Sequence, residues 1–209
     1  MADTLESFPL FPLGMVLLPQ ELAPLHIFEE RYKLMVGQCL EEEREFGILW
    51  LADDGLKEIG CAARIARVLE RFDDGRLNIL VEGSEPFRLL RKIGDLPYPA
   101  GDVELLDDAD AGPDPGDPAI ADHAHERYAD LVEQVTENRP ESGSLARLDA
   151  YGMAATLDVA LEAKQALLEL RSERVRLEQL DSLFAEALER IELAERAAER
   201  AAGNGSLHG

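Results

Sequence analysis

The sequence predicts an α+β fold, in which a small, partly closed β-barrel with one helix is followed by a small α-helical bundle. Up to Asp107, short apolar runs alternate with turns rich in Pro, Gly and Asp, a pattern typical of short strands. Beyond residue 118 the apolar spacing becomes that of helices. We therefore expect a β-rich subdomain at 1–107, an acidic Pro/Gly linker at 108–118, a helical bundle at 119–200 and a disordered tail at 201–209.

The first part of the chain is expected to form short strands and then a helix. Prolines mark the ends of the strands, because proline cannot donate to a sheet ladder; they are Pro9, Pro12, Pro19 and Pro24. The strands are expected at 8–13, 15–18 and 22–27, and the helix at 29–42. Its apolar residues repeat at the spacing of one helix face: Tyr32, Met35, Val36, Cys39 and Leu40. Glu29 and Arg31 are expected to form an ion pair at the helix start.

Later apolar runs predict the remaining strands of the barrel, at 46–52, 59–72, 77–83, 87–93 and 103–106. Asp73-Asp74-Gly75 predicts a hairpin turn, because Asp and Gly tolerate left-handed backbone. We expect Gly83 to end one strand before the next begins.

The bundle is expected to begin with a helix whose apolar face consists of Ile120, Ala124, Tyr128, Leu131, Val132 and Val135. Further helices are expected near Ser144, around Lys164 and from about Ser172, each with one apolar and one charged face.

The charge of the chain disfavours polyanionic partners. The formal net charge is −22, and acidic residues outnumber basic ones on both sides of Asp107. Nucleic acid and anionic membrane would be repelled at long range, so neither is an expected partner.

The cysteines and the amino terminus indicate a cytoplasmic protein. Cys39 and Cys61 are far apart and lie on apolar faces, so we expect small buried side chains rather than a disulfide or a zinc site. The start of the chain lacks the features of a signal peptide, and no apolar run approaches the roughly 20 residues of a membrane span.

Several segments resemble the amino-terminal domain of Lon, the ATP-dependent protease, a domain that also occurs alone in bacteria and, in a related version, in cereblon. They include FPLFPL at 8–13, PLHIFEERY at 24–32, IGCAARI at 59–65 and KQALLE at 164–169. The resemblance covers most of the chain and implies a PUA-like barrel. It gives structural roles to Pro9, Pro12, Pro24, His26, Phe28, Glu29, Arg31, Tyr32, Gly60, Gly75, Gly83, Lys164 and Gln165.

The same resemblance implies no catalysis by this chain. No GxxxxGK[ST] phosphate loop is present, and no segment aligns with the Ser-Lys peptidase domain of Lon. We assign no catalytic, cofactor-binding or metal-binding residues and expect no cofactor. Ser84 and Lys92 form the nearest pair for an undetected hydrolase, but a turn or surface position explains each of them better.

The expected function is therefore non-catalytic protein binding. The resemblance implies recognition of apolar segments in unfolded or target polypeptides, or action as a proteolysis adaptor with a protease as a further partner, by a monomer or weak dimer. An edge strand could accept an extended peptide. The candidate residues are Met15, Val16, Leu17, Leu18 and Trp50, for each of which core packing is the alternative.

Nucleic-acid binding is a second hypothesis, because PUA-like domains occur in RNA-modifying proteins. A modest basic cluster around the hairpin supports this hypothesis, and the net charge of the chain disfavours it. The cluster consists of Arg64, Arg67, Arg71 and Arg76.

Overall fold

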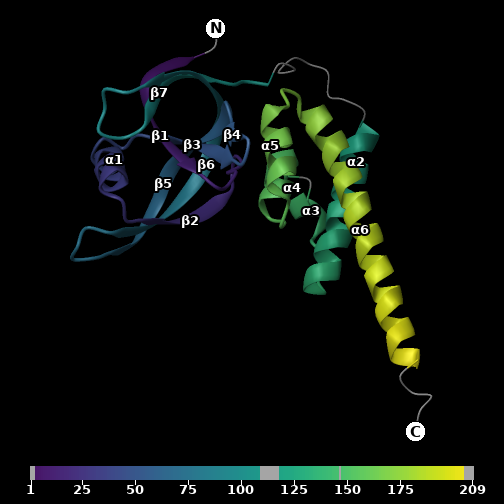
Figure 1. The fold of residues 1–209 in the computed structure, drawn as a ribbon. Helices are drawn as coiled ribbons and strands as arrows, with labels where there is room; N and C mark the ends of the chain where they lie inside the picture. The colour runs from purple at the N-terminus through teal and green to yellow at the C-terminus, as the bar shows by residue number, and fades with distance from the viewer. Residues whose placement is uncertain (1–2, 109–117, 146, 205–209) are drawn as a thin grey trace. The chain divides into compact units, whose positions relative to one another are not determined.

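The computed structural model describes residues 3–108, 118–145 and 147–204, which form two compact units. The first, here called the β unit, contains the described residues of Met1–Gly112 together with Tyr151–Ser172. The second, the helical unit, contains those of Pro113–Ala150 and Glu173–Gly209. Figure 1 shows the strands in one unit and the paired helices in the other.

The β unit contains all the strands: β1 (Thr4–Leu13), β2 (Leu22–Ile27), β3 (Phe46–Ala52), β4 (Gly55–Leu56), β5 (Ile59–Arg71), β6 (Leu77–Ile93) and β7 (Ala100–Leu105). Its helices are α1 (Glu30–Glu41), α5 (Leu161–Glu169) and α4 (Ala150–Ala155), the last from Tyr151 onward. The helical unit contains α2 (Pro118–Thr136), α3 (Ser142–Leu145) and α6 (Glu173–Asn204). No helix among the described residues is both long enough and apolar enough to cross a membrane.

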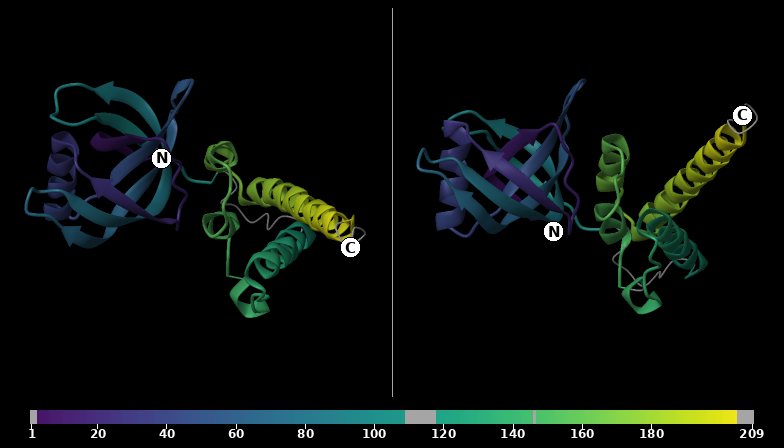
Figure 2. Two further views of the ribbon diagram at one scale, coloured as in Figure 1. Left: turned by 60° about the horizontal axis from the view of Figure 1, so that its bottom comes forward. Right: turned by 90° about the horizontal axis from the view of Figure 1, so that it is seen from below.

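The strands form one 7-stranded, mostly antiparallel sheet in the order β1-β7-β6-β5-β3-β4. A parallel pairing of β1 with β3 returns the sheet onto itself, and β2 pairs with β6 off this path. The sheet therefore curves around its interior without being a clean barrel, since β2 and β4 branch from it (Figure 2). The predicted α+β class, with a carboxy-terminal helical region, is confirmed.

The interior of the sheet is filled by side chains that alternate along the strands. One buried cluster comprises Phe8, Leu10, Leu49, Ala62, Phe87 and Val103. Helix α1 buries the predicted face against this unit, with Tyr32 packing its ring 4.1 Å from that of Phe11. Cys39 and Cys61 are buried free thiols, as predicted, and burial raises the pKa of Cys39 to about 11.

Two strand predictions are wrong. Residues 15–18 form no strand, although Val16, Leu17 and Leu18 are buried. Gly83 does not end a strand, because β6 runs without interruption from Leu77 to Ile93. Residues 20 and 21 cross this strand at Gly83: Gln20 N donates to Gly83 O at 2.8 Å, and Gly83 N donates to Glu21 O at 3.0 Å. The last strand also begins earlier than predicted, at Ala100.

The predicted domain division differs from the structure at α5. We expected this helix in the bundle, but it belongs to the β unit. Lys164 Nζ lies 2.6 Å from Glu21 Oε1, and Gln165 Nε2 donates to Ile59 O at 3.1 Å. Arg171 also donates to Leu106 O at 3.1 Å. These polar contacts hold α5 and Arg171 against parts of the β unit that are far from them in the sequence.

The helical unit is built on the pairing of α2 with α6, which run alongside one another (Figure 1). Tyr128 and Phe184 place their rings 6.1 Å apart, and Arg127 pairs with Asp181 at 2.5 Å. Val135, predicted on the apolar face of α2, is exposed instead.

Two predicted segments extend beyond the residues that the structure describes. In the predicted linker at 108–118, residues 109–117 lie outside that range, and Pro118 already begins α2. In the predicted tail at 201–209, residues 201–204 are helical because α6 extends to Asn204, and residues 205–209 are not described.

Candidate peptide-binding face

Strand β2 is an edge of the sheet. It pairs with residues 77–82 of β6 on one side, and within the described parts of the chain no strand pairs with its other side. Ala23 and Ile27 point into the core, so Leu22, Pro24 and His26 face outward. An open edge presents backbone donors and acceptors to any extended chain, and Pro24, which lacks an N–H, limits how many it can donate.

Exposed apolar side chains surround this edge. Phe28 and Leu22 are 59% and 56% exposed, and Leu69 of β5 is also exposed. A shallow pocket of about 480 Å³ lies here, bounded by Pro24, Leu25, His26, Leu69, Glu70 and Asn78. We call the surface formed by Leu22, Pro24, His26, Phe28 and Leu69 the β2 face.

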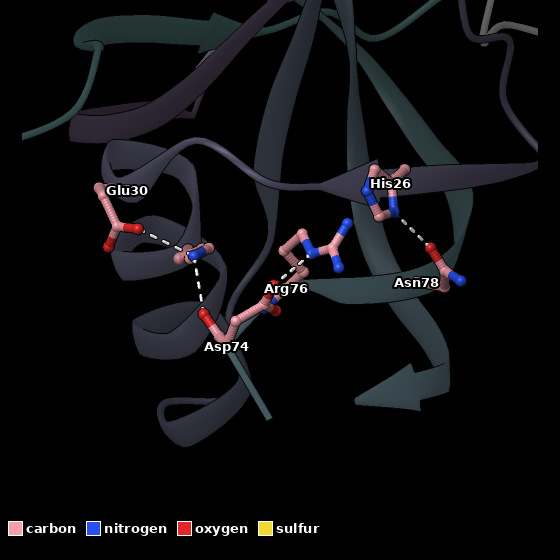
Figure 3. A network of polar contacts seen from close by, with 6 residues as sticks. His26, Glu30, Asp74, Arg76 and Asn78 are labelled. Atoms are coloured by element: carbon pink, nitrogen blue, oxygen red, sulfur yellow. Dashed lines mark hydrogen bonds and ion pairs between the residues drawn. The ribbon is translucent and has the colours of Figure 1, made fainter. Parts of the chain in front are cut away.

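His26 is held within the β2 face by a polar contact and by two rings. Its Nδ1 donates to Asn78 Oδ1 at 2.6 Å (Figure 3). Asn78 Nδ2 in turn donates to Glu70 Oε2 at 2.9 Å. The His26 ring stacks on Phe28 at 5.8 Å and meets the edge of Phe72 at 6.1 Å. This histidine is hydrogen-bonded as a structural residue would be, but it lies on the surface.

The β5–β6 hairpin is fastened to α1 at its tip. Gly75 has a φ of +81°, which the predicted turn requires. Lys33 Nζ donates to Asp74 O at 3.0 Å and to Glu30 Oε1 at 2.8 Å (Figure 3). The backbone N–H and guanidinium of Arg76 hold the pKa of Asp74 below its usual range, and Arg76 also lies 5.0 Å from the centre of the Phe72 ring. These contacts fix one border of the β2 face.

The basic cluster proposed for nucleic acid is partly neutralised by carboxylates. Arg64 pairs with Glu82 at 2.7 Å, and Arg76 pairs with Asp74 at 2.7 Å. Guanidinium groups that are already paired have less to offer a phosphate.

Most of the residues predicted to contact a peptide are in the core. Val16, Leu17 and Leu18 are at most 2% exposed, so their side chains are not available to a ligand. Met15 is half-buried. The segment leaves the surface because it passes over Gly83 of β6, a contact between residues far apart in sequence.

Trp50 has a different environment. It lies half-buried on β3, with Lys57 Nζ 5.6 Å from its ring centre. It lines a groove of about 660 Å³ that is also bounded by Asp53, Asp54 and Lys57, which flank β4, and by α5. We call this the Trp50 groove.

Several of the residues singled out by the family resemblance make contacts within the fold, whereas Pro24, His26 and Phe28 are exposed on the β2 face. Arg31 and Glu29 form the expected ion pair at 2.8 Å, and Tyr32 is buried beneath Arg31. A side chain at Gly60 would lie 2.3 Å from Ile48 O, which explains the glycine. Pro9 and Pro12 lie in β1.

Ser84 is engaged in the fold. Its hydroxyl donates to Ala62 O at 3.1 Å, which occupies the proton that a base would remove from a nucleophile.

Sequence reasoning missed the exposed residues of β2 and β5. The sequence did contain a sign of this face, because the exposed Leu22 and Phe28 stand next to the buried Ala23 and Ile27 in one apolar segment. Alternation alone does not say which of two apolar sets faces water.

A curved, mostly antiparallel sheet with a covering helix and a carboxy-terminal helical region is the fold of Lon N-terminal domains. The chain belongs to the family described as the ATP-dependent protease La (LON) substrate-binding domain, whose model it matches over residues 7–186. Domains of this family are not themselves catalytic.

Solved structures share this fold. The Lon N-terminal domain protein from Xanthomonas campestris has 26% sequence identity and a TM-score of 0.62, covering 84% of this chain and 97% of that chain. The N-terminal domain of the Mycobacterium avium complex Lon protease is similar in fold, with 18% identity, a TM-score of 0.66, and coverage of 86% and 98%.

Full-length relatives are much longer than this chain. The Lon protease of Anaeromyxobacter dehalogenans (strain 2CP-C) is 23% identical over 90% of this chain and 24% of its own length. Lon protease 2 of Myxococcus xanthus is 22% identical over 93% of this chain and 25% of its own length. The chain thus spans about a quarter of the relatives that it matches.

Proposed function

We propose that this domain binds apolar segments of unfolded or target polypeptides, catalyses no reaction on them, and uses the β2 face to do so. The observation that carries the proposal is the unpaired edge of β2 beside exposed Leu22, Phe28 and Leu69. The family to which the chain belongs supports it, because that family is named for substrate binding.

Two kinds of interaction would combine on this face. Backbone hydrogen bonds along β2 accept any extended sequence, because they do not depend on side chains. The exposed apolar side chains then favour segments with apolar residues, and each offers on the order of 1 kcal/mol when its remaining exposed surface is covered. Such binding is weak for one segment and tolerant of sequence, as recognition of many unfolded chains requires.

The β2 face can be tested with an unfolded protein as probe. Fluorescein-labelled, reduced and carboxymethylated α-lactalbumin should raise its anisotropy when the chain is added, whereas the native, disulfide-bonded form should not. Incubation of the unfolded form without ATP should leave no cleavage products.

A matched pair of variants locates the binding surface. Leu22→Ser with Phe28→Ser should weaken binding about tenfold, because on the order of 1–2 kcal/mol of apolar contact is removed. Leu90→Ser, at a position that is 52% exposed and outside the β2 face, should leave binding unchanged. Equal affinity for the double variant and the original chain would contradict the proposed face.

The contribution of the strand edge can be measured separately. A short apolar peptide should lose binding when alternate backbone nitrogens are methylated, since it can no longer pair with β2. Unchanged binding of the methylated peptide would show that side chains alone are recognised.

A further inference from the structure

The Trp50 groove is a second surface, separate from the β2 face and different in chemistry. We propose that it binds a polypeptide segment in which Lys or Arg stands next to an aliphatic residue. This proposal does not depend on the β2 face, and it assigns to the domain a preference for basic apolar segments.

One wall of the groove is held to the strands by a buried amide side chain. Gln165 of α5 is 5% exposed, and its Nε2 donates to Ile59 O at 3.1 Å and to Glu169 Oε1 at 3.0 Å. Its Oε1 has no hydrogen-bond partner among the described residues. This buried amide therefore fixes α5 against the strand that carries Ile59, and the groove meets a ligand through its other lining residues.

The rim of the groove is acidic. Asp53, Glu162 and Glu169 line it with exposed side chains, and within the described residues none of them forms an ion pair with a basic side chain. Three carboxylates without a cation attract a cationic ligand and repel an anionic one.

Trp50 lies beside a lysine of the groove lining. Lys57, a basic residue of the lining, lies 2.7 Å from Asp54 Oδ2 and 5.6 Å from the centre of the Trp50 ring. Because this ammonium group already lies beside the ring, Trp50 offers a ligand apolar contact area, and the attraction for a cation comes from the carboxylates of the rim.

Apolar surface lies beside these charges. Leu51 is 54% exposed and Leu161 is half-buried, and both line the groove with Trp50. A Lys or Arg could lay its aliphatic stem along this surface and keep its charge at the carboxylates, while a neighbouring Leu covers the exposed side chain. Charge and apolar area together therefore favour a basic apolar segment over a purely apolar one.

The groove contains its own reporter, because Trp50 is the only tryptophan of the chain. The probe is a short synthetic peptide without Trp or Tyr in which Lys and Arg alternate with Leu. We expect a saturable change of Trp50 emission, and an affinity that falls as salt is raised. Two matched peptides, one with Glu in place of Lys and Arg and one with Ser in place of Leu, should bind at least about threefold more weakly.

Charge variants at exposed positions test the site without disturbing the fold. Asp53→Asn with Glu162→Gln should weaken binding about threefold to tenfold, because two attractive charges are lost. Asp95→Asn with Glu41→Gln makes the same change of charge away from the groove and should leave affinity unaltered.

Three results would overturn the proposal: no saturable change with the basic peptide, equal binding of the acidic peptide, or equal weakening by both pairs of charge variants. The Leu22→Ser, Phe28→Ser variant separates the two surfaces. It should keep the Trp50 response, and loss of that response would assign the peptide to the β2 face instead.

Discussion

Lys164 and Glu21 form an ion pair between residues 143 positions apart in the chain. Their side chains are 11% and 13% exposed, so each charge depends on the other rather than on water. Glu21 also accepts a hydrogen bond from the backbone N of Leu18 at 2.9 Å. Removing one partner of such a pair leaves a poorly solvated charge, which costs more than the pair itself contributes.

We therefore expect Lys164→Met to lower the free energy of unfolding by about 3 kcal/mol. Urea unfolding followed by circular dichroism measures the change. Arg64→Met breaks the exposed pair with Glu82 and should cost less than about 1 kcal/mol. Adding Glu21→Gln to Lys164→Met should restore part of the loss, and a double variant less stable than either single variant would contradict this account.

At the scale of elements, β6 depends on a glycine in its interior. A Cβ atom at Gly83 would lie 2.0 Å from the carbonyl oxygen of Leu18 and 3.1 Å from Cys61 Sγ. The backbone of residues 18–21 crosses the strand at this point, and no side chain fits between them. Gly83 is therefore required by close approach of two segments rather than by a turn.

Gly83→Ala should destabilise the domain by about 1–3 kcal/mol, because the crossing segment must move away from β6. Gly94→Ala is the control, since nothing lies within 4 Å of a Cβ at that position. Thermal unfolding of the two variants measures the difference. Equal midpoints would show that residues 18–21 adapt without cost.

At the scale of the molecule, α5 is a part of the β unit although α2 of the helical unit precedes it in sequence. Segments that share buried contacts open together, so cooperative stability follows contacts rather than sequence order. The helical unit has its own packing between α2 and α6.

Native-state hydrogen exchange should therefore show α5 opening with β5 and β6 as denaturant is added. Lys164→Met should lower the opening free energies of α5 and of the strands together, while that of α2 stays unchanged. Exchange of α5 in step with α2 and α6 would place it in the bundle that we first expected.

Local patterns in the sequence were sufficient for much of the fold. The face of α1 follows from the spacing of Tyr32, Met35, Val36 and Cys39, and the hairpin follows from Asp73-Asp74-Gly75. The family was recognisable from its motifs, and the family model matches residues 7–186. These features could be predicted because helix periodicity and turn chemistry act over a few neighbouring residues.

The features of the fold that local patterns did not predict arise from contacts between segments that are distant in the sequence. Met15 to Leu18 and Leu22 to Phe28 are similarly apolar, yet Val16, Leu17 and Leu18 are buried while Leu22 and Phe28 are exposed. The difference arises because residues 18–21 pass over Gly83, whereas β2 has a partner strand on one side only among the described residues. From its own residues the chain specifies which segments become strands and helices, and the family motifs they carry. Two features depend on packing between parts of the chain that are far apart in the sequence. They are the choice of which apolar face meets water and the docking of α5 on the strands beside Trp50.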